Sequence, residues 1–185
     1  MGPKQVRTPL DDNHVLDLRA GDAVEISGVV LTARDAAHQR LIETLDRGEV
    51  LPVDLAGQVI YYVGPAPARP GAVIGSAGPT TSGRMDRYAP ALHAAGLRGT
   101  IGKGYRSDVV RQALVEHCGV YFAAVGGSGA LLAKRIVSAE VIAYPDLGTE
   151  AIWRLQLDRF PAIVVNDAYG ADLYSTAKGE YRRDG

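Results

Sequence analysis

Residues 22–48 read DAVEISGVVLTARDAAHQRLIETLDRG, and this stretch indicates the fold class. Its first part, residues 22–32, alternates in polarity and is rich in β-branched residues, which predicts a strand. In the part that follows, Ala37, Leu41 and Leu45 recur every fourth residue and share one face of a predicted helix. A strand that runs directly into an amphipathic helix is typical of an α/β fold.

The rest of the chain continues this alternation of short strands and helices. Thr32 and Asp35 match the Ser/Thr-x-x-Asp/Glu pattern of a helix start, and Gly48 is placed to end the first helix. Ser107 is placed to cap a later helix that ends at His117. Strands alternating with helices predict an α/β protein with a parallel or mixed sheet. Further strands are expected at residues 59–64, 72–78, 99–104, 120–126, 139–144, 151–157 and 161–166.

Composition limits the class of protein. The 185 residues fit one domain, and a hydrophobic content of 46% suffices for a core. Lys and Arg total 20 against 21 for Asp and Glu, and this balance argues against nucleic acid or an anionic membrane as the main partner. No uncharged apolar run spans a bilayer, and residues 1–14 lack the apolar core of a signal peptide. We expect one cytoplasmic domain over residues 1–185, with flexible tails at about residues 1–14 and 178–185.

Cysteine and histidine offer no metal site within the chain. Cys118 is the single cysteine, which excludes an internal disulfide framework and a multi-cysteine metal site. The four histidines, at residues 14, 38, 93 and 117, form no pair at metal-ligand spacing. We therefore expect this chain alone to bind no metal.

Cations and hydroxyls follow several of the predicted strands. Ligands of open α/β sheets lie at the carboxyl ends of the strands, in the loops that lead into helices. Arg34 comes after the first predicted strand, and Lys103 comes after GTIG at residues 99–102. Thr80, Thr81, Ser82 and Arg84 come after the predicted strand at residues 72–78. We expect these side chains to gather on one rim of the sheet.

The segment GPTTSGR, residues 78–84, carries the strongest signal of a site. Its three hydroxyls, Thr80 to Ser82, and the free N–H groups of a helix start favour an anion. Arg84 in the first turn can form two hydrogen bonds with a carboxylate. The same pattern also fits hydroxyls that only cap a helix beside a solvated arginine. With Arg34 and Lys103, the ligand implied is a di- or tricarboxylate or a phosphate.

Two glycine-rich segments are similar to nucleotide-binding loops without matching them. IGKG, residues 101–104, lacks the spacing and the following Ser or Thr of a phosphate-binding P-loop. GGSG, residues 126–129, lacks the third glycine of a dinucleotide site and fits a tight strand-to-helix turn better. No Ser-His-Asp order and no acidic pair at a strand end indicates catalysis. The residues alone therefore indicate an α/β domain that binds an anion.

Several blocks of sequence are specific when taken together. They include ARD at residues 33–35, IGSAGPTTSGRMD at residues 74–86, IGKG at residues 101–104 and FPAIVVNDAYGADLY at residues 160–174. With the segments between them, they resemble the β subunit, or C-terminal domain, of the class I iron–sulfur fumarases and the related L-tartrate dehydratases. The resemblance covers nearly the whole chain. It implies a swivelling β/β/α domain with a mixed sheet and flanking helices.

The resemblance also implies a reaction and a role for five residues. The family hydrates fumarate reversibly to L-malate, and a 4Fe–4S cluster held by three cysteines of the α subunit or N-terminal domain binds the substrate. Arg34 and Arg84 match arginines that bind the substrate carboxylates, and Lys103 matches a further cationic contact. Thr80 matches the proposed base that removes the C3 proton of malate, and Thr81 is its neighbour that orients the substrate or the loop. A threonine base needs an activating group, which we expect from the partner.

The implied protein is a hydro-lyase that is active only with its cluster-bearing α subunit, in an α2β2 heterotetramer. The segments around GPTTSGRMD and in the C-terminal part are more similar to the fumarase branch than to the tartrate branch. One alternative is an L-tartrate dehydratase β subunit. Another is a mesaconate hydratase β subunit, because the methyl group that distinguishes mesaconate from fumarate is a weak discriminator. A dicarboxylate-binding module without catalysis, or a protein that binds nucleotide or phosphate, is an alternative from another class.

Overall fold

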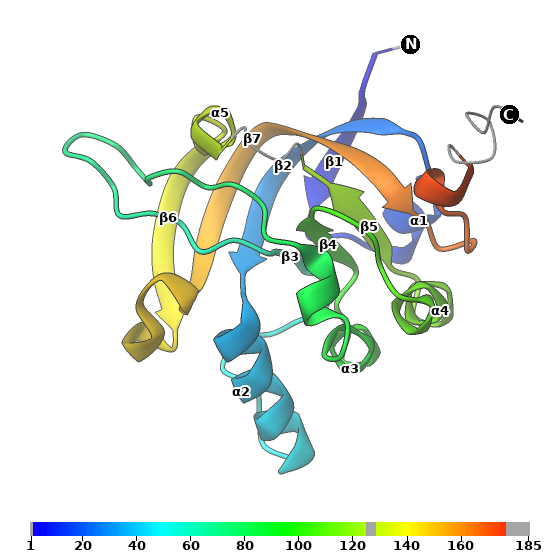
Figure 1. The fold of residues 1–185 in the computed structure, drawn as a ribbon, viewed down its shortest axis with the longest axis horizontal. Coiled ribbons are helices and arrows are strands. Elements are labelled where there is room, and N and C mark those ends of the chain that lie inside the picture. The colour runs from blue at the N-terminus through cyan, green and yellow to red at the C-terminus, as the bar shows by residue number, and fades with distance from the viewer. Residues whose placement is uncertain (1, 125–128, 177–185) are drawn as a thin grey trace, which may run out of the picture.

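Residues 2–124 and 129–176 of the computed structural model are described, and in them seven strands form one mixed sheet (Figure 1). The strands lie in the order β1-β2-β3-β4-β5-β7-β6. Because β2 also pairs with β7, the five strands β2, β3, β4, β5 and β7 close on themselves. The strands are β1 (Lys4–Thr8), β2 (Ala23–Thr32), β3 (Val59–Tyr61), β4 (Gly99–Gly102), β5 (Val120–Ala123), β6 (Ile136–Ala143) and β7 (Ile152–Asn166).

Strand direction determines which ends come together. Strands β2 to β5 run parallel to one another, and β7 runs antiparallel to both β2 and β5. The carboxyl ends of the four parallel strands therefore lie at the same edge of the sheet. This is the edge at which α/β sheets place ligands.

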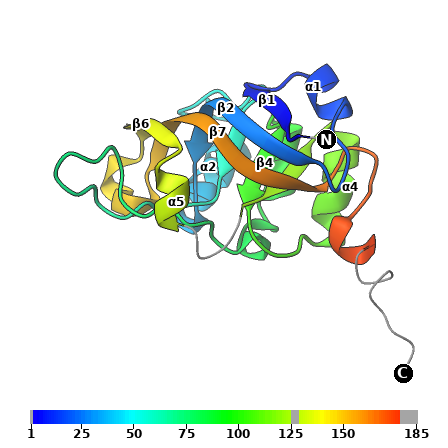
Figure 2. The same cartoon turned by 90° about the horizontal axis from the view of Figure 1, so that it is seen from above.

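Helices cover the sheet on more than one side. In Figure 1, α2, α3 and α4 lie below the strands, and α5 lies above β6 and β7. Figure 2 shows an arm between β3 and η1 that extends past β6 and away from the sheet. Among the described residues, no helix is long and apolar enough to cross a membrane. The helices are α1 (Asp12–Leu16), α2 (Asp35–Asp46), α3 (Ala89–Ala94), α4 (Asp108–Glu116) and α5 (Gly129–Ala133), with 3-10 helices η1 (Ser82–Met85) and η2 (Pro145–Glu150).

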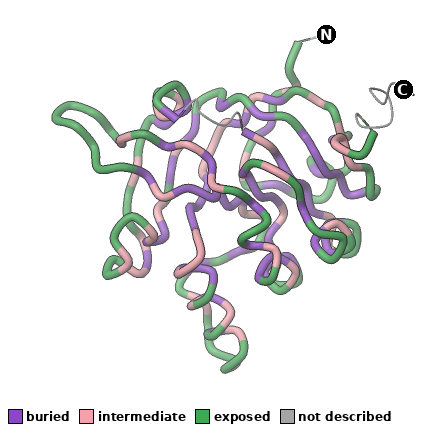
Figure 3. Tube along the Cα trace, viewed as in Figure 1, coloured by how far each residue is buried: buried purple, intermediate pink, exposed green. Residues whose placement is uncertain are grey.

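Successive residues at β3 belong alternately to two layers of the core, and Figure 3 shows the buried segments of the chain in purple. Val59 and Tyr61 pack inside the closed strands, and Ile60 and Tyr62 face the layer beneath α2 and α3. Successive strand residues point to opposite faces, and here both faces are buried. Each large apolar side chain buried in this way contributes about 1.5–3 kcal/mol. The core thus rigidly supports the strand ends from both sides.

The strand and helix predicted in residues 22–48 are confirmed as β2 and α2, but the predicted helix cap is wrong. The Thr32 hydroxyl is buried, donates to the carbonyl of Ala151 at 3.3 Å and accepts from the N–H of Trp153 at 3.0 Å. Both hydrogen bonds of this hydroxyl therefore go to the start of β7 and the residue before it, and not to the helix. Arg34 is the residue before the helix, and its side chain makes no capping hydrogen bond.

Two other expectations about strands are wrong. Residues 72–78 form no strand and belong to the arm, in which residues 66–73 are exposed. The two strands expected at residues 151–157 and 161–166 are the single strand β7. Its polar stretch around Asp158 suggests a turn, but the chain only bends there, with a φ of 47° at Arg159 opposite a register shift in β2.

No element is expected before residue 22, yet β1 and α1 lie there. β1 pairs in parallel with the first half of β2, and α1 follows it. Residues 4–14 are thus part of the sheet and its flanking helix, in the segment expected to be a tail. The other expected tail, residues 178–185, and residues 126–128 of GGSG lie outside the described residues.

Candidate active site

The carboxyl ends of β2, β3 and β4 meet at one edge of the sheet, which we call the rim. Arg34, Gly64 and Lys103 each come shortly after one of these strands. Arg34 lies between β2 and α2, and Lys103 directly follows β4. Parallel strands and short connections therefore bring together residues that lie far apart in the sequence.

The segment that contains Thr80 and Thr81 lies against the same rim. The N–H of Thr80 donates to the carbonyl of Tyr62 at 2.7 Å, and the N–H of Lys103 donates to the carbonyl of Thr80 at 3.3 Å. Thr81 and Lys103 form an isolated parallel bridge, and the N–H of Ser82 donates to the carbonyl of Lys103 at 2.8 Å. The backbone of the threonines is therefore fixed between the ends of β3 and β4.

Two expectations about this segment need correction. Ser82 is expected on the rim, but it is fully buried and its hydroxyl donates to the Tyr121 hydroxyl at 3.0 Å. A helix start is expected after the hydroxyls, but Ser82–Met85 is a single 3-10 turn. A dipole of aligned peptides needs a longer helix. The rim therefore offers an anion its cationic side chains and not a helix dipole.

A glycine in β4 lets the threonine segment approach the sheet. A Cβ on Gly102 would lie 1.9 Å from Oγ of Ser82 and 3.0 Å from a ring carbon of Tyr62. Only a residue without a side chain leaves room for the buried serine. The hydroxyl that accepts from Ser82, that of Tyr121, donates to the carbonyl of Gly104 at 2.9 Å. Ser82 and Tyr121 thus join the threonine segment to the end of β4.

Arg34 lies at the rim with part of its guanidinium buried. Its Nη2 lies 3.5 Å from Oε1 of Glu150, whose Oε2 accepts the N–H of Ala36 at 3.0 Å. Glu150 thereby bonds the first turn of α2, which Thr32 does not cap. Among the hydrogen bonds of the described residues, none uses the buried Nε of Arg34. A buried donor without a partner is costly, so a contact for this N–H would stabilise the site.

Arg84 is tied to the same corner of the rim. Its Nε donates to Oδ1 of Asp35 at 3.2 Å, and its Nη2 donates to Oδ2 at 2.7 Å. Asp35 is the residue after Arg34, so this ion pair joins η1 to the start of α2. Both arginines that the resemblance assigns to substrate carboxylates are therefore anchored at the junction of β2 and α2.

Lys103, Thr80 and Thr81 complete the set of expected residues. Lys103 and Thr81 are exposed, and Thr80 is half-buried. Within the part of the chain that the structure describes, Lys103 forms no ion pair, and the Thr80 hydroxyl makes no hydrogen bond. The rim thus carries one lysine, two arginines and a hydroxyl that has no activating group among the described residues.

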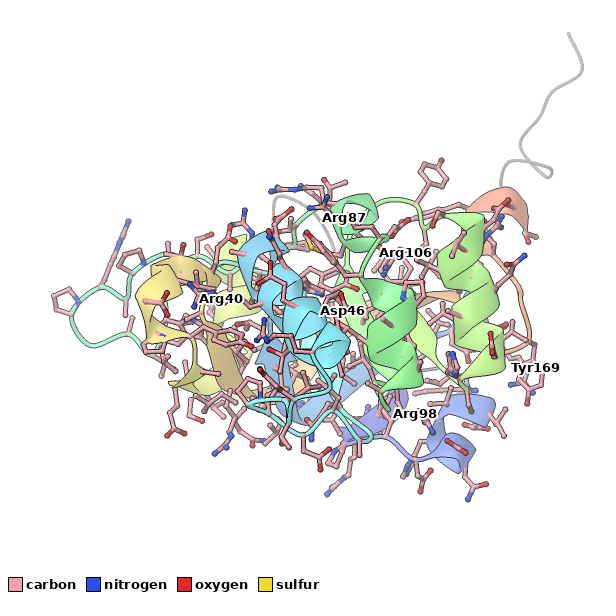
Figure 4. All side chains as sticks on the ribbon, turned by 90° about the horizontal axis from the view of Figure 1, so that it is seen from below. Arg40, Asp46, Arg87, Arg98, Arg106 and Tyr169 are labelled. Atoms are coloured by element: carbon pink, nitrogen blue, oxygen red, sulfur yellow. The ribbon has the colours of Figure 1, made fainter. Side chains whose placement is uncertain are left out.

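A buried arginine supports the rim from below. Figure 4 shows Arg106 between α3 and α4, and its side chain is fully buried. Its Nε donates to Oδ1 of Asp86 at 2.7 Å, and its Nη1 donates to the hydroxyls of Thr100 at 3.1 Å and Tyr62 at 3.3 Å. Burial opposes its charge, yet Tyr62 and Asp86 raise the pKa of Arg106 above its ordinary value. This network joins β3, β4 and the turn after η1.

His38 lies beneath Arg34 and is structural. Its Nδ1 donates to the Arg34 carbonyl at 2.8 Å, which requires the Nδ1–H tautomer, and its ring meets Tyr62 edge-on at 5.3 Å. Burial lowers the pKa of His38 to about 4, so the ring is neutral at pH 7. A neutral, enclosed imidazole packs against the rim residues and does not exchange protons with a ligand.

Two carboxylates of the rim are not predicted from the sequence. Asp35 is expected only as a charge in the first turn of a helix, and Glu150 has no expected role. Asp35 could be suspected from its place beside Arg34. Glu150 gives no such signal, because 114 residues separate it from Ala36, whose N–H it accepts.

The described residues do not supply the ligands of an iron–sulfur cluster. They contain no group of three His, Cys, Asp or Glu side chains that could hold a metal ion. Cys118 precedes β5, so it lies at the end of the sheet opposite the rim, near the Asp12 carbonyl. A 4Fe–4S cluster needs several thiolates at one place, and this chain has one cysteine.

Comparison with known proteins assigns the family. The fumarase C-terminus family matches residues 4–177, and the chain belongs to this family. Fumarate hydratase 2 of Leishmania major is 42% identical over 157 residues, which are 84% of this chain and 28% of that protein. The aerobic class I fumarate hydratase of Escherichia coli K12 is 42% identical over 153 residues, which are 82% of this chain and 28% of that protein. The resemblance inferred from the sequence is thereby confirmed.

One relative has a length similar to that of this chain. The putative L(+)-tartrate dehydratase subunit beta of Methanocaldococcus jannaschii is 36% identical over 171 residues, which are 89% of this chain and 88% of that protein. The chain therefore spans little more than a quarter of the two fumarate hydratases and most of the tartrate dehydratase subunit.

Proposed function

We propose that this chain is the β subunit, or the corresponding C-terminal part, of a class I fumarate hydratase. The observation that carries the proposal is the rim, where the ends of β2 and β4 and the segment that runs against them bring Arg34, Arg84, Lys103 and Thr80 to one edge of the sheet. Fumarate is a dianion, and three cations at one edge match two carboxylates. Family membership supports the proposal, because two of the relatives are named fumarate hydratase.

The proposed roles follow from where charge develops in the reaction. Arg34 and Arg84 bind the substrate carboxylates, and Lys103 provides a further cationic contact. Thr80 takes the C3 proton of malate, and the C3 electron pair moves toward the adjacent carboxylate. That pair then forms the C2–C3 double bond of fumarate as the C2 hydroxyl leaves as water. Cations fixed at that carboxylate stabilise the added charge more in the transition state than in the ground state. Thr81 orients the substrate or the segment.

The partner must supply what this chain lacks. In the resembling family, an open iron of a 4Fe–4S cluster acts as a Lewis acid on the substrate. We assign the cluster to an α subunit or N-terminal part, because the ligands are not present among the described residues. The same part would supply the group that activates Thr80, and an α2β2 assembly would build two such sites. The closed strands with flanking helices support a swivelling β/β/α domain that turns relative to that part.

A second candidate is the β subunit of an L-tartrate dehydratase. The observation in its favour is the match in length with the Methanocaldococcus jannaschii subunit, 88% of which is covered. Tartrate is also a dianion and would use the same three cations. The two substrates differ in their hydroxyl groups, so turnover on each decides between the candidates.

The test is anaerobic co-expression of this chain with a cluster-bearing α subunit, followed by assay of the purified complex. The proposal predicts a coloured complex that hydrates fumarate faster than it converts L-tartrate or mesaconate. Lys103→Ala should lower turnover by orders of magnitude, whereas Arg47→Ala, a matched loss of charge at the far end of α2, should not. Preference for tartrate would favour the second candidate. A complex that binds dicarboxylates without turnover would indicate a binding module.

A further inference from the structure

Asp35 and Arg84 are joined across the rim in a way that leaves Arg84 able to bind a second carboxylate. Asp35 accepts from Nε at 3.2 Å and from Nη2 at 2.7 Å, so it occupies one edge of the guanidinium. An arginine has five N–H donors in a rigid plane. With respect to the described residues, both donors of Nη1 and one of Nη2 remain, and they form a second fork on the adjacent edge.

This ion pair adds little to the stability of the fold. The Arg84 and Asp35 side chains retain 50% and 31% of their exposure, and ion pairs between exposed groups contribute little. The pair nevertheless orders a long, flexible side chain before any ligand arrives. Ordering a side chain beforehand strengthens binding, because the entropy cost is not incurred when the ligand binds.

The position of Asp35 connects this ordering to the rest of the site. It follows Arg34 in the sequence and begins α2, whose first turn is bonded by Glu150. Arg84 would otherwise project from the short 3-10 turn η1. Asp35 therefore fixes the guanidinium of Arg84 relative to Arg34, and the separation of two carboxylate-binding groups determines which dicarboxylate fits.

We propose that Asp35 is the positioning residue of Arg84: it holds the guanidinium on one edge so that the free fork faces a substrate carboxylate. The inference rests on the proposed function in that it takes Arg84 to bind a dicarboxylate. Asp35 does not touch the substrate in this account. Its effect is exerted through Arg84 alone.

A double-mutant cycle tests this role. The complex of the full chain with its α subunit is prepared with Asp35→Asn, Arg84→Ala and both changes. The control is Asp146→Asn, since Asp146 pairs with Arg40 through two similar hydrogen bonds of 2.9 and 2.5 Å between α2 and η2 and contacts neither Arg34 nor Arg84 among the hydrogen bonds and ion pairs of the described residues. Figure 4 shows Arg40 in that position. Succinate affinity is measured by calorimetry, and kcat and KM are measured on fumarate.

Asp35→Asn should weaken succinate binding and raise KM by about tenfold, the effect of one hydrogen bond to a charged group, with a smaller change in kcat. In the Arg84→Ala background it should change neither quantity, and Asp146→Asn should match the wild type. Asp35→Glu keeps the charge and should recover part of the affinity, which separates positioning from a loss of folding.

Additive effects of Asp35→Asn and Arg84→Ala would overturn the inference, as would an Asp35→Asn complex that binds succinate like the wild type. A wild-type complex that binds no succinate would overturn it as well. If the complex binds succinate but does not hydrate fumarate, the proposed function fails, and the succinate cycle alone decides whether Asp35 positions Arg84.

Discussion

The guanidinium of Arg34 lies directly over Gly64. A Cβ on Gly64 would stand 2.6 Å from Nη1 and 3.1 Å from Cδ of Arg34. The backbone of Gly64 does not lie in the left-handed region, so the residue is needed for space and not for its conformational freedom. The loop after β3 thus leaves a place for the arginine that follows β2.

Gly64→Ala should therefore displace Arg34 while leaving the fold intact. The added methyl group meets the far end of a flexible side chain and also lies 3.3 Å from the backbone carbonyl oxygen of Thr149. The carbonyl has to shift only slightly, so the free energy of unfolding should fall by about 1 kcal/mol. Loss of one charge-assisted contact should weaken dicarboxylate binding by about tenfold or more. Calorimetry with succinate and denaturant unfolding of the same preparations measure the two effects.

The control for this prediction is the Arg34→Ala background. There Gly64→Ala has no guanidinium to displace and should not reduce the affinity further. A further reduction in that background would show that the methyl group acts on something other than Arg34.

Asp86→Asn should destabilise the fold strongly. It removes the carboxylate from a fully buried Arg106, and a buried charge without its partner costs about 3–5 kcal/mol. Asp146→Asn breaks an exposed pair and should cost less than about 1 kcal/mol. Urea unfolding of the two variants and the wild type measures the two losses in the free energy of unfolding. Equal losses of stability would mean that the network of Arg106 does not support the rim.

Strands and helices whose apolar residues recur with a clear period, such as β2 and α2, were predictable from the sequence. The capping role of Thr32 was not, because its hydroxyl bonds to β7 residues more than a hundred positions away. The bend at Arg159 could not be told from a turn, since only the register with β2 shows that the strand continues. The local pattern of residues does not indicate hydrogen bonds between segments that lie so far apart in the sequence.

The candidate site divides in the same way. Arg34 and Lys103 were expected because they follow predicted strands, and the parallel order of β2, β3 and β4 places both at one edge. The burial of Ser82 was missed, because it depends on Gly102 and Tyr121, which belong to other strands. The contact of Glu150 with Arg34 could not be predicted from the residues around either position. The catalytic and substrate-binding roles of the rim residues stay predictions.

Acidic pH should destabilise the chain through two histidines. Burial lowers the pKa of His38 and of His93 from 6.5 to about 4, so the folded state binds fewer protons than the unfolded state between these values. The free energy of unfolding should be highest above pH 6.5 and fall as the pH drops toward 4, by about 3 kcal/mol for each histidine.

Urea unfolding between pH 4.5 and pH 7.5 measures this dependence. Replacing both residues, as in His38→Gln with His93→Gln, should flatten it, because glutamine does not titrate. Asp146 and Glu49 have pKa values lowered by Arg40 and Arg47 from 3.8 and 4.5, so they contribute only at lower pH. An unchanged slope in the double variant would contradict the assignment to these histidines.

This chain is proposed to supply the proton-transferring half of a shared active site. Thr80→Val, which removes the hydroxyl and keeps the shape, tests it in the anaerobic complex with the α subunit. The account predicts that kcat on fumarate falls by about 100-fold to 10,000-fold, the usual contribution of a general acid–base group, while succinate affinity stays within a few fold. A Thr80→Val complex that hydrates fumarate at the wild-type rate would contradict the account.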